Sequence, residues 1–431
     1  MRFDILKNLS AKEKRTFYLH MTFQVIDGMM RAALWINEYV FVKSLNGSSY
    51  QLSFLFQSSV IVLLLSILFN ELINRAKNKR KLLRRAGFLT HLPLLFLLFF
   101  PKNPEFYTVN SIYHYMFLFI FFTYYISYPI VLPTINLFLK NSYSKDNFGK
   151  MYGLSSSVRQ IVMMVTFFAL GLVLDANALS FTWFFPILGL LGIISIILIG
   201  KIEFTLKTVP EFTEGIFDAI VGSFKKMVRM LKTNRAYFDY QLAYMFYGFA
   251  FMSTRSVINI FYDKALDLNY SSVAFYQNAY NLITILLLPV FGKIIGKVDP
   301  RKFTIIPFIS MAGYILFTGL TKYYSLSIVI WKFDIYITLL IATIFYGFFF
   351  STMLLSWNIG SSYFGRNEEA GDYHAIHLFG TGLRGAVSPL IGVVLYELFG
   401  FSLTFLIAII SLVIGIYVLY WSTKKRVVSS Q

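Results

Sequence analysis

An aspartate and an arginine lie in the middle of the first long apolar stretch of the chain, residues 17–41. Asp27 and Arg31 are four residues apart, so they share one face of a helix and can form an ion pair. A charged side chain at the centre of a bilayer costs at least roughly 2.5–3.5 kcal/mol, so such residues usually face protein or a water-filled cavity. Two interpretations follow: a pair that only holds helices together, or a site for a substrate or a coupling ion.

Three further arginines lie inside apolar stretches: Arg159, Arg255 and Arg384. A guanidinium group can bind a carboxylate or a phosphate through two parallel hydrogen bonds. We therefore expect Arg31 and Arg255 to bind a small organic anion. In the alternative interpretation, Arg31 is neutralised within its own helix and Arg255 extends toward Asp263 near the end of its stretch.

Asp27 is the candidate group for binding a coupling proton or sodium ion. A carboxylate beside an arginine becomes easier to protonate when a substrate draws the arginine away. The alternative is a permanent structural pair. Arg159 and Arg384 lie close to the starts of their apolar stretches, and we expect them to anchor helix ends or to gate a pathway.

Polar residues recur on one face of the apolar stretch 271–295, at Gln277, Asn281 and Thr284. Asn259 follows Arg255 by about one helical turn. The pattern predicts that Asn259, Gln277 and Asn281 contribute to a substrate site with Arg255. The alternative is that these side chains form hydrogen bonds between helices, which is a common role for polar groups in membranes.

Several kinds of chemistry find no support in the sequence. The chain has no cysteine, so it has neither disulfides nor thiolate ligands. His374 and His377 are three residues apart, but no further metal ligands cluster near them, so we predict no metal site. Phosphate-binding glycine loops, His-Glu-x-x-His and nucleophile elbows are absent. We therefore expect no cofactor, no enzymatic activity and no ATP-driven pumping.

The composition is typical of a polytopic membrane protein. Of the 431 residues, 57% are hydrophobic and only 14% are charged. Stretches long and apolar enough to cross a bilayer predict an all-α protein with twelve transmembrane helices. The predicted spans are 17–41, 51–70, 86–100, 107–139, 153–174, 179–200, 236–262, 271–295, 303–321, 333–356, 372–398 and 401–421. The third is interrupted by Pro93.

The distribution of basic residues predicts the orientation in the membrane. Of the 39 lysines and arginines, 30 lie in the two tails and in the loops on one side, and 5 lie in loops on the other side. The positive-inside rule places the rich side and both termini in the cytoplasm, as expected for a plasma membrane protein, here of the bacterial cytoplasmic membrane. The net charge of +18 is therefore a topology signal with a possible anionic-lipid contact, and we expect no nucleic-acid partner.

The segment 201–235 divides the spans six and six. We predict an N-terminal six-helix bundle over 1–200, a cytoplasmic linker over 201–235 and a C-terminal six-helix bundle over 236–431. Residues Thr208 to Glu211 resemble a capping box. Apolar residues then recur at helical spacing, which predicts a helix lying in the membrane interface: Phe217, Ile220, Phe224, Met227, Val228 and Leu231.

The second half of the chain repeats features of the first half at a nearly constant offset. The interval from Arg31 to Arg255 is almost the same as the interval from Arg159 to Arg384, so all four intramembrane arginines fall into two repeat-related pairs. Six spans per repeat is an even number, so both repeats enter the membrane from the same side. The halves are therefore predicted to be parallel repeats, related by an axis along the membrane normal.

The loop after the eighth span carries a further pattern. It reads Gly292-Lys-Ile-Ile-Gly296-Lys297-Val-Asp299-Pro-Arg301-Lys302. With the twelve spans and the six-plus-six division, it resembles the major facilitator superfamily of secondary transporters, whose loops after spans 2 and 8 carry glycine and basic residues at these spacings. Gly292, Lys297, Arg301 and Lys302 match that pattern. The loop after span 2 keeps basic residues at Arg75, Lys79 and Arg80, but has Asn70 and Asn74 where the family has glycine and aspartate.

The resemblance implies a fold of two six-helix bundles in which spans 1, 4, 7 and 10 line a central cavity. Arg31 and Arg255 would then face each other across the pathway, an arrangement that resembles the organophosphate/phosphate antiporters. Gly292, Lys297 and Arg301 would belong to a gating or structural loop. These are expectations from the family, whereas the residues themselves predict only buried cations.

We therefore predict a secondary active transporter that works by alternating access, with a central site between two bundles. The expected partners are the lipid bilayer, a small organic anion and a coupling ion, and we expect a monomer. Two alternatives stay open. The high phenylalanine and tyrosine content suggests an exporter of amphiphilic compounds or lysolipids, and a membrane sensor or assembly protein could keep the same helices without transport.

Overall fold

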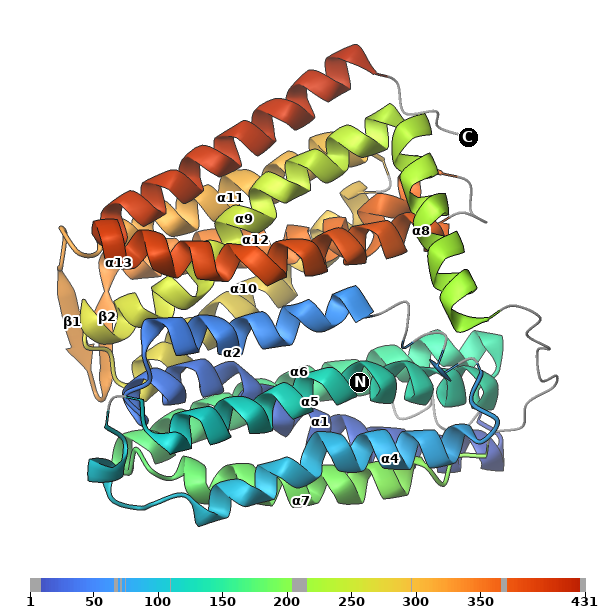
Figure 1. Cartoon of the computed structure of the whole chain (residues 1–431), viewed down its shortest axis with the longest axis horizontal. Helices are drawn as coiled ribbons and strands as arrows, with labels where there is room; N and C mark the ends of the chain where they lie inside the picture. The colour runs from blue at the N-terminus through green and yellow to red at the C-terminus, as the bar shows by residue number, and fades with distance from the viewer. Residues whose placement is uncertain are drawn as a thin grey trace. The chain divides into compact units, whose positions relative to one another are not determined.

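The computed structural model describes residues 9–65, 69, 72–73, 75–108, 110–203, 215–295, 297–365 and 370–426. Nearly all of the described chain is helical (Figure 1). The helices of the first half are α1 (Ala11–Lys43), α2 (Ser49–Ile61), α4 (Lys79–His91), α5 (Ile112–Ser142), α6 (Lys145–Ala176) and α7 (Phe181–Ile199). The later helices are α8 (Ile216–Thr233), α9 (Arg235–Lys264), α10 (Tyr270–Ile295), α11 (Pro300–Leu320), α12 (Ile337–Ile359) and α13 (Ala370–Lys425).

Each predicted span coincides at least in part with a helical segment, and residues 66–68 and 70 of the second span lie outside the described residues. Among the described residues, eight helices are long and apolar enough to cross a membrane by length and composition. The third span is irregular, as its proline suggests: α4 ends at His91, and a 3-10 helix continues over Leu92–Phe99. The last two spans are two helices that meet at a kink at Gly400, and both carry the label α13. This residue has φ +75°, a conformation that favours glycine, so the break lies between the two predicted spans.

Side-chain caps fix where the first two helices begin. The Ser10 hydroxyl accepts a hydrogen bond from the Glu13 amide, and the Glu13 carboxylate accepts one from the Ser10 amide. Ser48 and Gln51 form the same reciprocal pair at the start of α2. Each pair satisfies two backbone donors that have no partner inside the helix.

A helix is present where the interfacial helix was predicted, α8, with Phe217 and Phe224 exposed, and its location in the membrane interface stays a prediction. The capping box predicted at Thr208 to Glu211 lies outside the described residues, as do Asn70, Asn74 and Gly296 of the loop motifs. One boundary in the second half is wrong. The tenth span was expected to begin at residue 333, but residues 327–336 form an antiparallel hairpin, β1 (Ser327–Ile330) and β2 (Phe333–Tyr336), before α12 begins.

Contacts between Cα atoms divide the chain into two units. The first contains 1–47 and 68–215, and the second contains 48–67 and 216–431. The division groups α2 with the second unit, where the Gln57 side-chain amide donates a hydrogen bond to the Ala386 carbonyl of α13. Gly385 of α13 lies against Val60, where a Cβ atom would overlap the valine side chain. The bundle boundaries expected from the sequence stay a prediction.

Each unit contains one pair of helices that run in the same direction and position the candidate site. In the first unit, contacts between α1 and α6 advance together along both helices, from Glu13 with Ser144 to Asp27 with Arg159. In the second unit, contacts between α9 and the first part of α13 advance from Tyr237 with Tyr373 to Gln241 with His377. In both pairs, polar residues of the two helices therefore contact each other at more than one level along the helices.

Candidate functional site

A buried carboxylate is the centre of the polar cluster in the first unit. Asp27 is only 4% exposed. Its Oδ2 atom lies 2.7 Å from Arg31 Nε, which confirms the ion pair predicted from the spacing. The Tyr128 hydroxyl of α5 donates a hydrogen bond of 2.6 Å to Oδ1, and Arg31 Nη2 donates one of 3.3 Å to the same hydroxyl oxygen. Three side chains from two helices thus form a closed network.

Arg159 of α6 also belongs to this cluster. Its Nη1 atom lies 3.7 Å from Asp27 Oδ2, and its side chain is 21% exposed. The sequence suggested a place near the helix end, but α6 begins at Lys145 rather than at residue 153, so Arg159 lies well inside the helix. The close approach depends on Gly28, because a Cβ atom there would lie 2.6 Å from the Arg159 carbonyl oxygen.

The charges in this cluster do not cancel. Asp27 supplies one negative charge, whereas Arg31 and Arg159 supply two positive charges. The buried Nε–H of Arg159 has no hydrogen-bond partner among the described residues. A site with surplus positive charge and an unused donor is suited to an anion, because each desolvated cation gains from a counter-charge.

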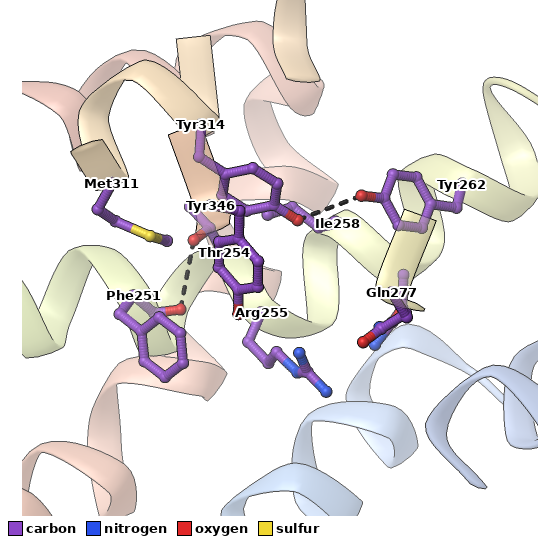
Figure 2. A pocket seen from close by; sticks show the side chains of 10 residues that line it. Phe251, Thr254, Arg255, Ile258, Tyr262, Gln277, Met311, Tyr314 and Tyr346 are labelled. Carbon is purple, nitrogen blue, oxygen red and sulfur yellow. Dashed lines mark hydrogen bonds between the residues drawn. The ribbon is translucent and has the colours of Figure 1, made fainter. Parts of the chain in front are cut away.

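In the second unit, Arg255 lines a small cavity of about 20 Å³, and Figure 2 shows the lining side chains. This is room for about one water molecule. The structure brings together three of the predicted site residues here: Arg255, Asn259 and Gln277 all line the cavity. The predicted Asn281 is buried on α10 but does not line it. Thr284 on the same helix bonds the carbonyls of Tyr280 and Gly347, as expected for polar contacts between helices.

Three tyrosines complete the cavity and were not predicted. Tyr262 is on α9, Tyr314 on α11 and Tyr346 on α12. The hydroxyls of Tyr262 and Tyr314 lie 3.2 Å apart and form a hydrogen bond, which Figure 2 shows. Tyr262 follows Arg255 by two helical turns, a spacing that could have indicated it. The other two come from distant helices, and no spacing in the sequence connects them to Arg255.

A second and more apolar pocket of about 160 Å³ lies in the same unit. It shares Phe251 with the Arg255 cavity. Its walls come from α9 and α12 and are mostly aromatic or aliphatic: Tyr247, Phe251, Phe349, Phe350, Met353, Leu354, Trp357 and Asn358. The second unit therefore places a polar, arginine-containing cavity next to an aromatic pocket.

Arg384 of α13 is buried without a carboxylate. It is 3% exposed. Its Nη2 donates a hydrogen bond of 2.6 Å to the Thr381 hydroxyl, and its Cζ lies 5.9 Å from the centre of the Tyr244 ring. Nη1 has only the Met245 sulfur, at 4.0 Å, and Nε has no partner within the described chain. No acidic side chain of the described residues forms an ion pair with it, which is unusual for a buried arginine.

The loop that matches the superfamily pattern supplies none of the described residues that line the Arg255 cavity or the aromatic pocket. Gly292 and Lys297 are exposed, whereas Arg301 is 1% exposed. Arg301 Nη2 lies 2.7 Å from Asp299 Oδ2, and Nη1 donates to the Ser422 carbonyl and hydroxyl at the end of α13. Burial opposes ionisation of Asp299, but hydrogen bonds from Arg301 outweigh it and lower the pKa of this carboxyl. The loop thus anchors α11 to α13.

Several solved transporters share this fold. A mutant of the nucleoside transporter NupG gives a TM-score of 0.71 at 10% identity, covering 95% of this chain and 99% of that chain. A bacterial homologue of the human lysosomal transporter Spinster gives 0.66 at 12% identity, covering 97% and 98%. A D-xylose–proton symporter gives 0.62 at 14% identity, covering 96% and 97%.

At these identities the structural likeness shows the fold alone. A search of curated proteins by sequence finds no match. The sequence model of the Major Facilitator Superfamily, however, matches residues 21–358, which is most of the chain and includes α5, α6, α9 and the greater part of α1. On this match, the chain belongs to the major facilitator superfamily.

Proposed function

We propose that the chain is a secondary active transporter of a small organic anion, coupled to protons or sodium ions and working by alternating access. Its family makes it an integral, multi-pass membrane transporter of a small molecule. The proposal also includes three predictions from the sequence: the protein is located in the bacterial cytoplasmic membrane, both termini are cytoplasmic, and the protein is a monomer. The expected site between the two bundles stays a prediction.

The observation that carries the proposal is the charge imbalance around Asp27. Two guanidinium groups, those of Arg31 and Arg159, share one buried carboxylate. At an effective dielectric constant near 20, unit charges about 4 Å apart interact by about 4 kcal/mol. An anionic substrate would therefore gain affinity from Arg31, whose side chain is 33% exposed and so reachable.

The same geometry supports Asp27 as the coupling group. Its carboxylate is held by Arg31, Tyr128 and, at a longer distance, Arg159. A substrate anion that draws Arg31 away removes the shortest of these charged contacts, so Asp27 can then accept a proton or a sodium ion. One structural neighbour is named a D-xylose–proton symporter, which is consistent with proton coupling on this fold.

A second candidate function is export of amphiphilic compounds. The observation that favours it is the aromatic pocket lined by Tyr247, Phe349 and Trp357, which could accept an apolar group without any charge. In that case Asp27, Arg31 and Arg159 would form a permanent structural network, and substrate binding would not depend on Arg31.

Thermal stability of the purified protein separates the two functions. A ligand stabilises the folded state by mass action, by about 2.7 kcal/mol at one hundred times its dissociation constant. The ligands tested are a set of phosphate esters and carboxylates, with lysophosphatidylcholine as the amphiphile. Anion transport predicts a shift with an anion in the wild type that disappears in Arg31→Gln. A shift with the amphiphile alone, equal in both proteins, would favour the exporter.

A further inference from the structure

We propose that the anionic group of the substrate binds beside Arg384 and supplies the counter-charge that Asp27 supplies to Arg159, and that the substrate carries an apolar group of about the size of a benzene ring. The inference deepens the proposed anion transport and rests on it. It assigns Arg384 a direct contact with substrate, where the sequence suggested an anchoring or gating role.

The first step is a structural correspondence between the two helix pairs. Aligning Arg31 with Arg255 matches α1 to α9, and aligning Arg159 with Arg384 matches α6 to the first part of α13. The ring of His20 lies 5.7 Å from the ring of Tyr152 in the first unit. In this alignment the corresponding residues of the second unit are Tyr244 and His377, and their rings lie 4.6 Å apart. The pair is preserved with its two residue types exchanged.

The second step is what this correspondence places beside each arginine. Arg384 corresponds to Arg159, and Phe251 corresponds to Asp27. In the first unit, the carboxylate of Asp27 compensates Arg159. In the second unit, the chain supplies a phenylalanine at the matching position. The described residues contain no acidic partner of Arg384 elsewhere, so the counter-charge present in one repeat is missing from the other.

The third step is the set of hydrogen-bond donors around Arg384. The arginine Nε–H is buried without a partner among the described residues. The nearby His377 ring has its Nδ1 atom 3.3 Å from the amide oxygen of Gln241. Gly248 of α9 leaves the space for the arginine, because a Cβ atom there would overlap the Arg384 side chain. A buried cation with spare donors is complementary to a carboxylate or phosphate.

The fourth step is the pocket beside this cluster, which indicates the rest of the substrate. Phe251 lines the aromatic pocket of about 160 Å³. Tyr247, next to Gly248 in sequence, also lines it, and so does Trp357, whose ring lies 5.7 Å from the His377 ring. A cavity of about 150 Å³ is large enough to hold benzene. The geometry therefore favours an aromatic or similarly compact apolar anion.

Equilibrium binding to the full-length protein in detergent, measured by titration calorimetry, tests the inference. The probes are benzoate and phenyl phosphate, with inorganic phosphate as the probe that lacks an apolar group. We expect one of the first two to bind the wild type and Arg384→Gln to weaken that binding at least about tenfold, since a charge-assisted contact is lost. Arg229→Gln, which removes an exposed arginine of α8, should bind as the wild type does.

Phe251→Asp provides a second variant that does not remove the arginine. It supplies the second unit with the carboxylate that Asp27 supplies in the first. We expect it to lose binding of the probe while unfolding at a temperature no lower than the wild type. If Arg384→Gln fails to fold, this variant decides the question, because unchanged binding in Phe251→Asp would overturn the inference.

The possible failures are distinguishable. If Arg31→Gln and Arg255→Gln abolish binding of the probe while Arg384→Gln binds as tightly as the wild type, anion transport stands and the role of Arg384 is wrong. If inorganic phosphate binds as tightly as the aromatic anions, the aromatic pocket has no part in recognition and the inference is overturned. If no anion binds the wild type, the proposed function is wrong, and this inference, which rests on it, is wrong as well.

Discussion

Asp27 of α1 and Arg159 of α6 form an ion pair with 3.7 Å between Oδ2 and Nη1, inside the first unit. The same carboxylate oxygen lies 2.7 Å from Arg31. Asp27→Asn would leave two guanidinium groups near each other without a counter-charge. We expect a loss of about 3–5 kcal/mol in the free energy of unfolding, the usual cost of removing one partner of a buried pair.

Chemical unfolding in detergent measures this loss. Adding Arg159→Gln to Asp27→Asn should restore part of the stability, because it removes one of the two unpaired charges. Equal stability of Asp27→Asn and the wild type would contradict a stabilising role for the ion pairs of Asp27 with Arg31 and Arg159.

Glu13, in the first turn of α1 and before the predicted span, gives a pH-dependent prediction. Hydrogen bonds from the Asn147 side chain and the Ser144 backbone, with those from Ser10, lower its pKa from 4.5 to about 2. A carboxyl with a lowered folded-state pKa stabilises the protein fully above its unfolded value and loses that effect as the pH falls. We therefore expect this contribution to disappear between about pH 4.5 and about pH 2.

The unfolding temperature as a function of pH tests this. Glu13→Gln should be less stable than the wild type at pH 6 and should lack this part of the acid dependence. Glu203→Gln is a suitable control, because Glu203 is exposed and its contacts with Lys12 and Arg15 are long, at 4.0 and 3.6 Å. A Glu13→Gln curve parallel to that of the wild type would be evidence against the cap.

Two glycines with different surroundings give opposite predictions. Gly28 lies against the Arg159 carbonyl, so Gly28→Ala must push α1 from α6 and should cost about 1–3 kcal/mol. Gly292 has open space where a Cβ atom would stand, so Gly292→Ala should stabilise α10 by about 0.5–1 kcal/mol. Unfolding of both variants in the same detergent gives the comparison. A stabilising Gly28→Ala would mean that the two helices are not closely packed.

Arg301 provides a prediction about the end of α13. It bonds Asp299, the Ser422 carbonyl and the Arg426 carbonyl while almost fully buried. Lysine cannot make these forked contacts, so Arg301→Lys should loosen the last turns of α13. Hydrogen exchange should become faster at residues 415–426 in this variant but not in Lys302→Gln, where an exposed side chain changes. Unaltered exchange would remove the anchoring role of Arg301.

Much of the fold follows from local pattern. The lengths of apolar stretches identify the spans, and the four-residue spacing of Asp27 and Arg31 predicts their ion pair, because both features depend on neighbours along one helix. The nearly equal intervals within the two arginine pairs also identified the helix pairs that correspond in the structure. What the pattern could not show is that Arg159 reaches Asp27. That contact depends on where α6 begins and on the close packing at Gly28.

The tyrosines of the site also make contacts between helices that the sequence pattern could not predict. Tyr128 bonds Asp27, and Tyr314 and Tyr346 line the Arg255 cavity, all from helices far away in the sequence. Tyrosine is too common in this chain for these positions to stand out. The β1–β2 hairpin was missed because its apolar residues read as the beginning of a membrane span. Its tight turn includes Trp331 at φ 58°, a backbone conformation that is uncommon for tryptophan, so the residue type did not indicate a turn.

Uptake into proteoliposomes tests most directly whether the chain transports a small organic anion through its arginines. Radiolabelled benzoate and glycerol 3-phosphate serve as probes, with an imposed proton or sodium gradient. The account predicts saturable, gradient-driven accumulation of at least one anion by the wild type, and its loss in Arg31→Gln and in Arg255→Gln proteins that remain folded. Equal uptake by both variants and the wild type, or movement of lysophosphatidylcholine without any anion, would contradict it.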